Sequence, residues 1–320
     1  MAGLEGKRIL VTGGAGFVGS HIIDLLGEER CRSVVAIDNL ARGSPVNLAF
    51  SLARPEVSLV EGDIRDSALM RRLMGGTDLV FHQAALRITQ CAAEPQAAFE
   101  TMAQGTFELA QLASELGVEK VIYASSASIY GAADQFPTDE GHHGHNDDTL
   151  YGASKLFGEA MLRALRVPHL SLRYFNVYGP RMDIHGRYTE VLVRWMERLE
   201  AGEAPIIFGD GGQTMDFVHV RDVARANLLA AKSELSGAAF NVACGIETSL
   251  LELASALAEA MGRPAIAPQF LPAREVNPVP RRLAETGKAS RLLGFQARIP
   301  LRAGLADLVA WWRSARDAAA

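Results

Sequence analysis

The sequence has few cysteines and no long apolar run. Cys31, Cys91 and Cys244 are isolated and form no CxxC pair, so neither a disulfide scaffold nor a zinc site is indicated. No apolar stretch reaches the length of a membrane span, and the residues after Met1 are too few and too polar for a signal peptide. A net charge of -5 provides no positive surface for nucleic acid or an anionic membrane. We therefore expect a reduced, cytoplasmic enzyme.

The chain of 320 residues can bury a large core, and its 48% hydrophobic and 22% charged residues are ordinary for a globular enzyme. Strand-like runs at 57–60, 79–82, 121–124 and 170–174 alternate with helical stretches. This alternation predicts βαβ units around a parallel sheet. After Gly179 the helices are broken by prolines and glycines. The predicted fold class is α/β, a Rossmann doubly wound parallel sheet with a smaller C-terminal substrate domain.

A glycine-rich turn follows the first strand-like run, Lys7–Thr12. Gly13, Gly16 and Gly19 are each three residues apart, a GGxGxxG spacing in place of the usual GxGxxG, and an apolar helical stretch comes next. Strand, glycine turn and helix are the context that a dinucleotide fingerprint requires. The small residues let the backbone approach a pyrophosphate, whose charge then meets the positive N-terminus of the helix.

The second strand-like run ends in Asp38. A carboxylate about 20 residues past the glycines accepts hydrogen bonds from the ribose hydroxyls of the adenosine. It would repel a 2′-phosphate, and Asn39 rather than an arginine follows it. The sequence therefore predicts NAD in preference to NADP.

Tyr151 and Lys155 are four residues apart, in Tyr-Gly-Ala-Ser-Lys. On a helix such residues project from the same face. A nearby ammonium group favours the phenolate, so it should lower the pKa of the tyrosine from its usual value of about 10. A tyrosine base beside a nicotinamide indicates that a proton and a hydride leave one carbinol together.

With these motifs the chain resembles the extended short-chain dehydrogenase/reductase superfamily. Within it, the chain is most similar to the NAD-dependent nucleotide-sugar epimerases and dehydratases, of which UDP-galactose 4-epimerase is the best-known branch. The resemblance covers nearly the whole chain. It also rests on the segments Gly62–Ile64, His82–Ala85, Ser125–Gly131, Arg173–Pro180 and Asp216–Asp222.

The resemblance implies a division of the chain and a set of site residues. It implies an NAD-binding domain at 1–177 and an interleaved substrate domain at 178–320, of which roughly 213–235 packs back on the first domain. Tyr151 would be the base, Lys155 would hold the nicotinamide ribose, and Ser126 would bind the reacting hydroxyl. The predicted cofactor-binding residues are Gly13, Gly16, Phe17, Val18, Gly19, Asp38, Asn39, Asp63, Ile64, Gln83, Ala84, Ala85, Arg87, Ser125, Tyr151, Lys155 and Tyr174.

The resemblance also implies a substrate, a nucleotide-diphosphate sugar and most readily a UDP-sugar. The predicted substrate-binding residues are Ser126, Ser128, Asn176, Arg187, Arg274 and Arg282. Met215 stands where an arginine usually meets the diphosphate, so Arg274 is expected to supply a phosphate contact. Arg282 falls where the family borders the sugar. An arginine there reads a carboxylate, as in a uronic acid, or holds phosphate.

The two residues after Ser126 separate the chemistries of this family. The 4,6-dehydratase branch has an Asp-Glu pair there, because eliminating water needs an acid and a base. This chain has Ala127 and Ser128, which can do neither. We therefore predict an NAD-dependent 4-epimerase whose substrate is of the UDP-glucose/galactose, UDP-N-acetylhexosamine or UDP-glucuronate type. The alternatives are a nucleotide-sugar oxidoreductase such as a 4-keto-sugar reductase, a dehydratase that uses a carboxylate from elsewhere (Glu140 or Asp183), and a non-catalytic dinucleotide sensor.

Two further features lead to expectations about a metal and a partner. His142, His143 and His145 lie in a glycine-containing loop whose spacing sets no ligand geometry. Since hydride transfer needs no metal, we expect an exposed loop and no metal. The stretches 97–116 and 152–165 read as helices with apolar faces, and the resemblance implies a homodimer in which they form a four-helix bundle. Those faces could instead all cover the sheet.

Overall fold

The computed structural model describes residues 3–184, 190–272 and 279–317. Its main feature is a seven-stranded sheet in which every pair of neighbouring strands is parallel. In spatial order the strands are β10 (Ala238–Val242), β6 (His169–Tyr174), β5 (Lys120–Ser126), β4 (Leu79–His82), β1 (Arg8–Thr12), β2 (Ser33–Asp38) and β3 (Val57–Glu61). The order runs outward from β1 in both directions, so the sheet is doubly wound, as predicted.

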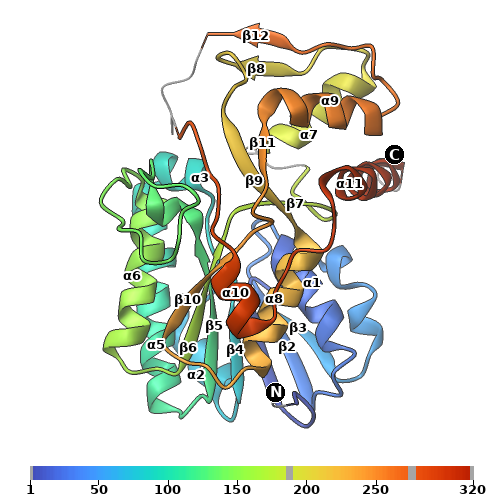
Figure 1. Cartoon of the computed structure of the whole chain (residues 1–320). Helices are drawn as coiled ribbons and strands as arrows, with labels where there is room; N and C mark the ends of the chain where they lie inside the picture. Colours follow the sequence, from blue (N-terminus) through green and yellow to red (C-terminus); the bar gives the residue numbers. More distant parts are fainter. Residues whose placement is uncertain (1–2, 185–189, 273–278, 318–320) are drawn as a thin grey trace.

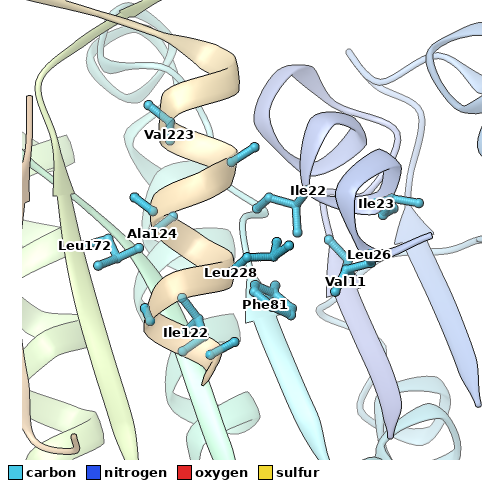
Figure 2. Packing of buried hydrophobic residues seen from close by; sticks show 14 of the residues in the cluster. Val11, Ile22, Ile23, Leu26, Phe81, Ile122, Ala124, Leu172, Val223 and Leu228 are labelled. Atoms are coloured by element: carbon cyan, nitrogen blue, oxygen red, sulfur yellow. The ribbon is translucent and has the colours of Figure 1, made fainter. Parts of the chain in front are cut away.

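Helices cover both faces of this sheet (Figure 1). Successive strand residues enter different cores, since Val11 packs with α1 (Phe17–Leu26) and α8 (Val220–Lys232), whereas Leu10 packs on the opposite face. Figure 2 shows Ile22 of α1 and Leu228 of α8 meeting above Phe81. The opposite face is covered by α2 (Ser67–Met74), α5 (Gly105–Glu115) and α6 (Leu150–Ala164). Strands buried on both sides explain why they read as continuous apolar runs.

A smaller lobe stands above the carboxyl edge of the sheet (Figure 1). It contains β8 (Ile206–Phe208), β12 (Gln269–Leu271), α7 (Val191–Glu200), α9 (Leu250–Ala260) and α11 (Leu301–Asp317). Its separate core is built around Trp195 and Trp312, both of which are buried. Ser249 and Glu252 form a capping box that starts α9.

The chain crosses between the two lobes more than once. A three-stranded sheet of β7 (Asn176–Tyr178), β9 (Thr214–His219) and β11 (Glu247–Ser249) joins them. α8 then packs on α1, β10 becomes the edge strand of the large sheet, and α10 (Gly287–Leu293) packs beside it. α8 lies within the expected returning segment 213–235, and β10 and α10, which follow it, lie beside the large sheet as well.

The remaining elements lie near the carboxyl edge of the large sheet or beside it. They are η1 (Pro45–Leu48), η2 (Ser51–Ala53), α3 (Ile88–Ala93), α4 (Pro95–Ala98), the π-helical segment η3 (Phe99–Gln104) and η4 (Ala127–Tyr130). None of the helices within the described ranges has both the length and the apolar character needed to cross a bilayer. In a doubly wound sheet, ligands bind at the carboxyl ends of the strands where the order reverses, which here is between β1 and β4.

Candidate active site

A cavity lies at this reversal point, and the predicted cofactor residues gather around it. Every predicted cofactor residue except Arg87 lines the cavity: Gly13, Gly16, Phe17, Val18, Gly19, Asp38, Asn39, Asp63, Ile64, Gln83, Ala84, Ala85, Ser125, Tyr151, Lys155 and Tyr174. They come from the ends of β1 to β6 and from the starts of α1 and α6. The cavity thus spans the glycine turn at one end and Tyr151 at the other.

The glycine turn forms a backbone cradle that side chains would fill. Gly13 has φ of +63°, and a Cβ there would lie 2.8 Å from the backbone nitrogen of Ala84. A Cβ on Gly19 would lie 2.2 Å from the carbonyl oxygen of Gly13. The turn ends at the N-terminus of α1, which starts at Phe17. This arrangement fits a pyrophosphate, which needs close backbone approach and a helix N-terminus.

Asp38 is buried at the end of β2, in the position expected for a ribose contact. Its Oδ2 accepts a hydrogen bond from Ala15 N at 3.0 Å and its Oδ1 accepts one from Leu40 N at 2.9 Å. Burial raises the pKa of this carboxyl, and the backbone donors oppose that shift. The carboxylate is therefore held in place by the glycine turn and by the loop that follows β2.

We expect Asp38→Ala to weaken NAD binding about 10- to 100-fold and NADP binding less, because the lost acceptor serves ribose hydroxyls that NADP partly replaces with phosphate. Titration calorimetry with both cofactors measures this. The control is Glu61→Ala, since the exposed Glu61 lies beside Asp38 in register on β3. An equal loss for NAD and NADP would contradict the role of Asp38.

Arg87 does not lie in the cofactor cavity. Its Nη1 forms an ion pair with Glu190 of the smaller lobe at 3.1 Å. The prediction that placed Arg87 with the cofactor rested on its position after His82–Ala85. In the structure Arg87 caps the start of α3 with extended backbone and its side chain points to the other lobe. Arg87 thus joins the two lobes beside the site.

The predicted catalytic residues lie together at the end of β5 and the start of α6. Thr149 caps α6 by accepting a hydrogen bond from Gly152 N at 3.0 Å, which positions Tyr151 in the first turn. Ser126 Oγ accepts a hydrogen bond from Ser128 N at 3.1 Å, and the Ser126 hydroxyl is close enough to the Tyr151 phenol to favour its ionised form. Lys155 is 2% exposed and donates to the carbonyl of Ala124 at 2.6 Å.

The sequence predicted that Lys155 lowers the pKa of Tyr151, and the structure contradicts this prediction. Burial raises the pKa of Tyr151, and the groups that oppose this shift are the Ser126 hydroxyl and the Arg282 guanidinium. The Lys155 Nζ lies 5.7 Å from the centre of the Tyr151 ring, and burial lowers the pKa of Lys155 to about 8. The lysine is directed to a backbone carbonyl, so Ser126 and Arg282 act on the phenol more directly than sequence spacing suggested.

Two of the predicted substrate residues, Ser128 and Arg282, border this group, and Asn176 lies where the two lobes join. Arg282 Nη1 lies 3.5 Å from Ser128 Oγ. Asn176, at the start of β7, has a buried Oδ1 with no hydrogen-bond partner among the described residues. Ala127 and Ser128 are both buried and begin η4, so no carboxylate follows Ser126. Arg187 and Arg274, the other two predicted substrate residues, lie outside the described residues.

A family model described as the NAD dependent epimerase/dehydratase family matches residues 9–243. The chain belongs to this family. It is 35% identical over 316 residues to a UDP-glucose 4-epimerase of Mycolicibacterium smegmatis, with 96% of this chain and 99% of that one covered. It is 32% identical to a dTDP-glucose 4,6-dehydratase of Actinoplanes, over 97% of this chain and 99% of the relative.

A solved structure agrees with both the family and the fold. The UDP-glucose 4-epimerase of Thermotoga maritima, determined with UDP-glucose, superimposes with a TM-score of 0.89 at 34% identity and covers 97% of this chain and 99% of that one. The predictions of the family, of the Rossmann fold and of NAD as the cofactor are confirmed. The predicted enzyme class, an NAD-dependent nucleotide-sugar 4-epimerase, agrees with these relatives.

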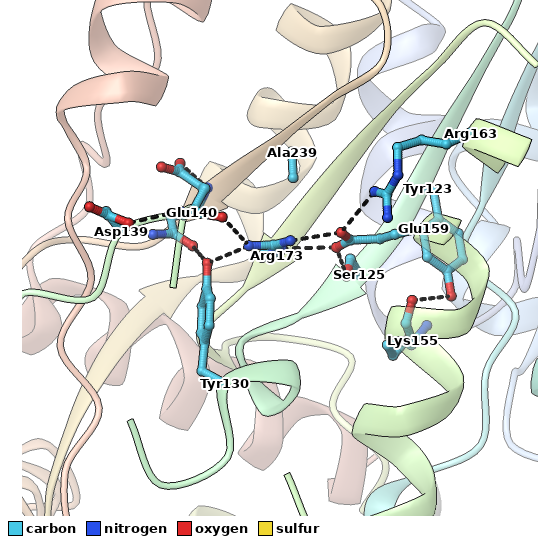
Figure 3. A network of polar contacts seen from close by, with 12 residues as sticks. Tyr123, Ser125, Tyr130, Asp139, Glu140, Lys155, Glu159, Arg163, Arg173 and Ala239 are labelled. Atoms are coloured by element: carbon cyan, nitrogen blue, oxygen red, sulfur yellow. Dashed lines mark hydrogen bonds and ion pairs between the residues drawn. The ribbon is translucent and has the colours of Figure 1, made fainter. Parts of the chain in front are cut away.

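Beneath the active site of this epimerase-family enzyme lies a buried ionic network that sequence analysis missed (Figure 3). Arg173 donates from Nε and Nη2 to the two oxygens of Glu159 at 2.9 and 2.8 Å. Ser125, which lines the cavity, donates to the same carboxylate at 2.5 Å. Tyr130 joins the network through Arg173 and donates to Asn241 at 2.7 Å. Tyr130 is therefore a buried structural residue, and so is Tyr178 in the core of the smaller lobe.

Two cavity residues were also missed. Arg42 and Asp183 line the cavity from opposite lobes and form an ion pair of 3.4 Å. Arg42 lies four residues after Asp38, but nothing in the local sequence indicates a partner 141 residues away. Glu140, considered above as an alternative acid, instead accepts a hydrogen bond from Asn241 N at 2.7 Å.

The histidine loop is less exposed than predicted. The His142 side chain is only 2% exposed and pairs with Asp134 at 2.8 Å, while His143 pairs with the other oxygen of Asp134 at 3.3 Å. Their possible ligand atoms lie within 4.8 Å of one another. His142 Nδ1 also lies 2.7 Å from the carbonyl of His143. These contacts hold the loop before α6 in place, and the chemistry at Tyr151 requires no metal from it.

Proposed function

We propose that this enzyme inverts the configuration at C4 of a nucleotide-diphosphate sugar through a 4-keto sugar. The observation that carries the proposal is the position of Tyr151 and Lys155 in the cofactor cavity, beside Ser126, which is followed by Ala127 and Ser128 in place of carboxylates. The site has a base for one carbinol and lacks the acid–base pair that elimination of water needs.

The residues divide the work by position. Tyr151 removes the proton of the C4 hydroxyl, and the Ser126 hydroxyl holds that oxygen beside the phenol. Lys155 sits beneath Tyr151 and within reach of the nicotinamide ribose, since it lines the same cavity. NAD, when bound along the cavity, supplies the acceptor and then the donor of the C4 hydride. Tyr151 returns the proton after the keto sugar has turned over, which leaves the enzyme unchanged.

The nucleotide and phosphates are assigned to the smaller lobe. Asn176 has a free buried Oδ1 at the junction of the lobes, where it can accept a hydrogen bond from the substrate. Arg187 and Arg274 are proposed to hold the diphosphate, because two phosphates need cationic or backbone partners. The relatives named UDP-glucose 4-epimerase support uridine as the base. The free thiols of Cys31, Cys91 and Cys244 suit a reducing compartment, and we place the enzyme in the cytoplasm.

The direct test is proton NMR of UDP-sugars incubated with the purified enzyme, with absorbance of reduced cofactor followed in parallel. We expect a mixture of C4 epimers to form without added cofactor and without net change in reduced NAD. A reductase would instead consume or release cofactor in proportion to product, and that result would overturn the proposal.

We also propose that the enzyme is a homodimer through α6 and the α4–η3–α5 stretch. Phe99 of η3 is 59% exposed and Phe157 of α6 is 39% exposed, and the two elements are in contact. Exposed aromatic side chains on neighbouring helices are typical of an interface. The described structure therefore leaves part of these apolar faces uncovered by the sheet.

Phe157→Glu should convert the dimer to a monomer, because it places a charge in the centre of the proposed interface. Light scattering at micromolar concentration measures the mass. Phe50→Glu is the control, since Phe50 is 65% exposed but lies beside η2, away from α6. Wild-type protein that is monomeric, or a dimer that survives the Phe157 change, would refute this interface.

A further inference from the structure

Arg282 is fixed in the active site from the smaller lobe. Its backbone nitrogen donates to Thr214 O at 2.9 Å, and Arg281 forms a bridge with the same residue of β9. The side chain extends from there to Ser128, with Nη1 3.5 Å from the hydroxyl oxygen. It is also close enough to influence the pKa of Tyr151. Arg282 therefore brings a positive charge beside the catalytic base.

The charge of Arg282 has no matching anion within the described residues. Arg282 forms no ion pair there, and its Nε is buried without a hydrogen-bond partner. Two groups act electrostatically on it, the Tyr151 phenol, whose pKa is raised by burial, and Asp147. The Oδ1 of Asp147 already accepts hydrogen bonds from the Thr149 nitrogen and hydroxyl at 3.0 and 2.8 Å. A guanidinium cannot lose its proton in a protein, and a buried charge left unpaired is costly. An anionic group of a bound ligand would provide the counter-ion that the Arg282 guanidinium lacks.

The neighbouring Arg281, unlike Arg282, has a carboxylate partner within the described protein. Its Nε and Nη2 donate to the two oxygens of Glu247 at 2.7 and 2.9 Å, and its side chain is 44% exposed. The two arginines are adjacent in sequence and share a strand-like backbone, but only Arg281 has a carboxylate partner in the described protein. The guanidinium of Arg282 instead lies near Ser128 and Tyr151.

We propose that Arg282 binds a carboxylate at C6 of the sugar, so that the substrate is a nucleotide-diphosphate uronic acid. This inference rests on the proposed function, which places C4 of the sugar at Tyr151. In a pyranose, C4 and the diphosphate-bearing C1 lie at opposite ends of the ring, whereas the C5 substituent is next to C4. An anion that meets an arginine beside Tyr151 is therefore the C6 carboxylate, and the diphosphate lies across the ring.

Ser128 completes the carboxylate site. Its hydroxyl can accept from Arg282 Nη1 and donate its own proton to the second oxygen of the carboxylate. Arginine presents parallel N–H donors that match a carboxylate in a bidentate pair. Ser128, which replaces a carboxylic acid of the dehydratase branch, is thus part of the binding site for the C6 group.

The test compares kcat/KM for UDP-glucuronate and UDP-glucose in the holoenzyme. We expect the wild type to prefer UDP-glucuronate, and Arg282→Gln to lower the ratio of the two kcat/KM values about 100-fold, as expected when one partner of a desolvated charge pair is removed. Arg282→Lys should recover part of that ratio, because it restores the charge without the fork. Arg281→Gln is the matched control and should leave the ratio unchanged.

Two measurements separate the possible failures. Inhibition by UDP, which has the diphosphate but no sugar, should change little in Arg282→Gln, while a large loss would assign Arg282 to phosphate and overturn the inference. Equal losses of kcat/KM for both sugars would overturn it as well. If the wild type epimerises UDP-glucose and not UDP-glucuronate, only the carboxylate inference fails. If it epimerises neither of these, nor UDP-N-acetylglucosamine or UDP-N-acetylgalactosamine, while NAD stays bound, the proposed function fails with it.

Discussion

Tyr151→Phe should lower kcat at least about 1000-fold while NAD stays bound, because only the group that accepts the C4 proton is removed and the ring remains. The loss should not be recovered at higher pH, since the other described tyrosine that lines the cavity, Tyr174, uses its hydroxyl to donate to Gln83 and Asn227. Initial rates and the NAD content of the purified variant measure both parts of this expectation.

Tyr178→Phe is the control for this substitution. It also removes a buried tyrosine hydroxyl, but that hydroxyl donates to Leu301 O at 3.3 Å in the smaller lobe, away from the cavity. Its rate should remain within a few-fold of the wild type. Turnover in Tyr151→Phe close to that of the control would rule out Tyr151 as the base.

Glu159→Leu should lower the free energy of unfolding by about 3–5 kcal/mol, the range seen when one partner of a buried ion pair is removed. Glu159 is fully buried and accepts from both Arg173 and Ser125. The substitution leaves the largely buried Arg173 guanidinium without its carboxylate. Urea denaturation of the holoenzyme measures the change.

The comparison for this stability effect is Glu115→Leu. Glu115 pairs with Arg71 at 2.6 Å, but both side chains are more than half exposed, so the loss should stay below about 1 kcal/mol. Similar losses of unfolding free energy in Glu159→Leu and Glu115→Leu would show that burial of the Glu159–Arg173 pair does not increase its contribution to stability. Because Ser125 lines the cofactor cavity, weaker NAD binding in Glu159→Leu is expected as well.

The parts of the site that sequence analysis predicted are those encoded by neighbouring residues. The glycine turn, Asp38 at the end of its strand, and the Tyr151–Lys155 spacing each lie within one βαβ unit, where local periodicity and strand position determine the geometry. All of them line the cavity in the structure. The strand and helix alternation likewise predicted the doubly wound sheet.

The parts that were missed depend on contacts between distant segments. Arg42 meets Asp183, and Arg173 meets Glu159, only after the sheet and the second lobe have assembled. Arg87 is absent from the lining of the cavity, and its partner Glu190, which belongs to the other lobe, could likewise not be read from the local sequence. Burial determines the direction in which the pKa of Tyr151 shifts, and the spacing of residues along a helix does not predict burial.

The most direct test of the central claim follows the hydrogen at C4. UDP-glucose and UDP-glucuronate deuterated at C4 are incubated with the enzyme, and the products are examined by mass spectrometry and NMR. Removal and return of hydride at one carbon predicts a C4 epimer of unchanged mass that keeps its deuterium at C4. Loss of one water from the product, or deuterium appearing in released reduced cofactor, would contradict the account.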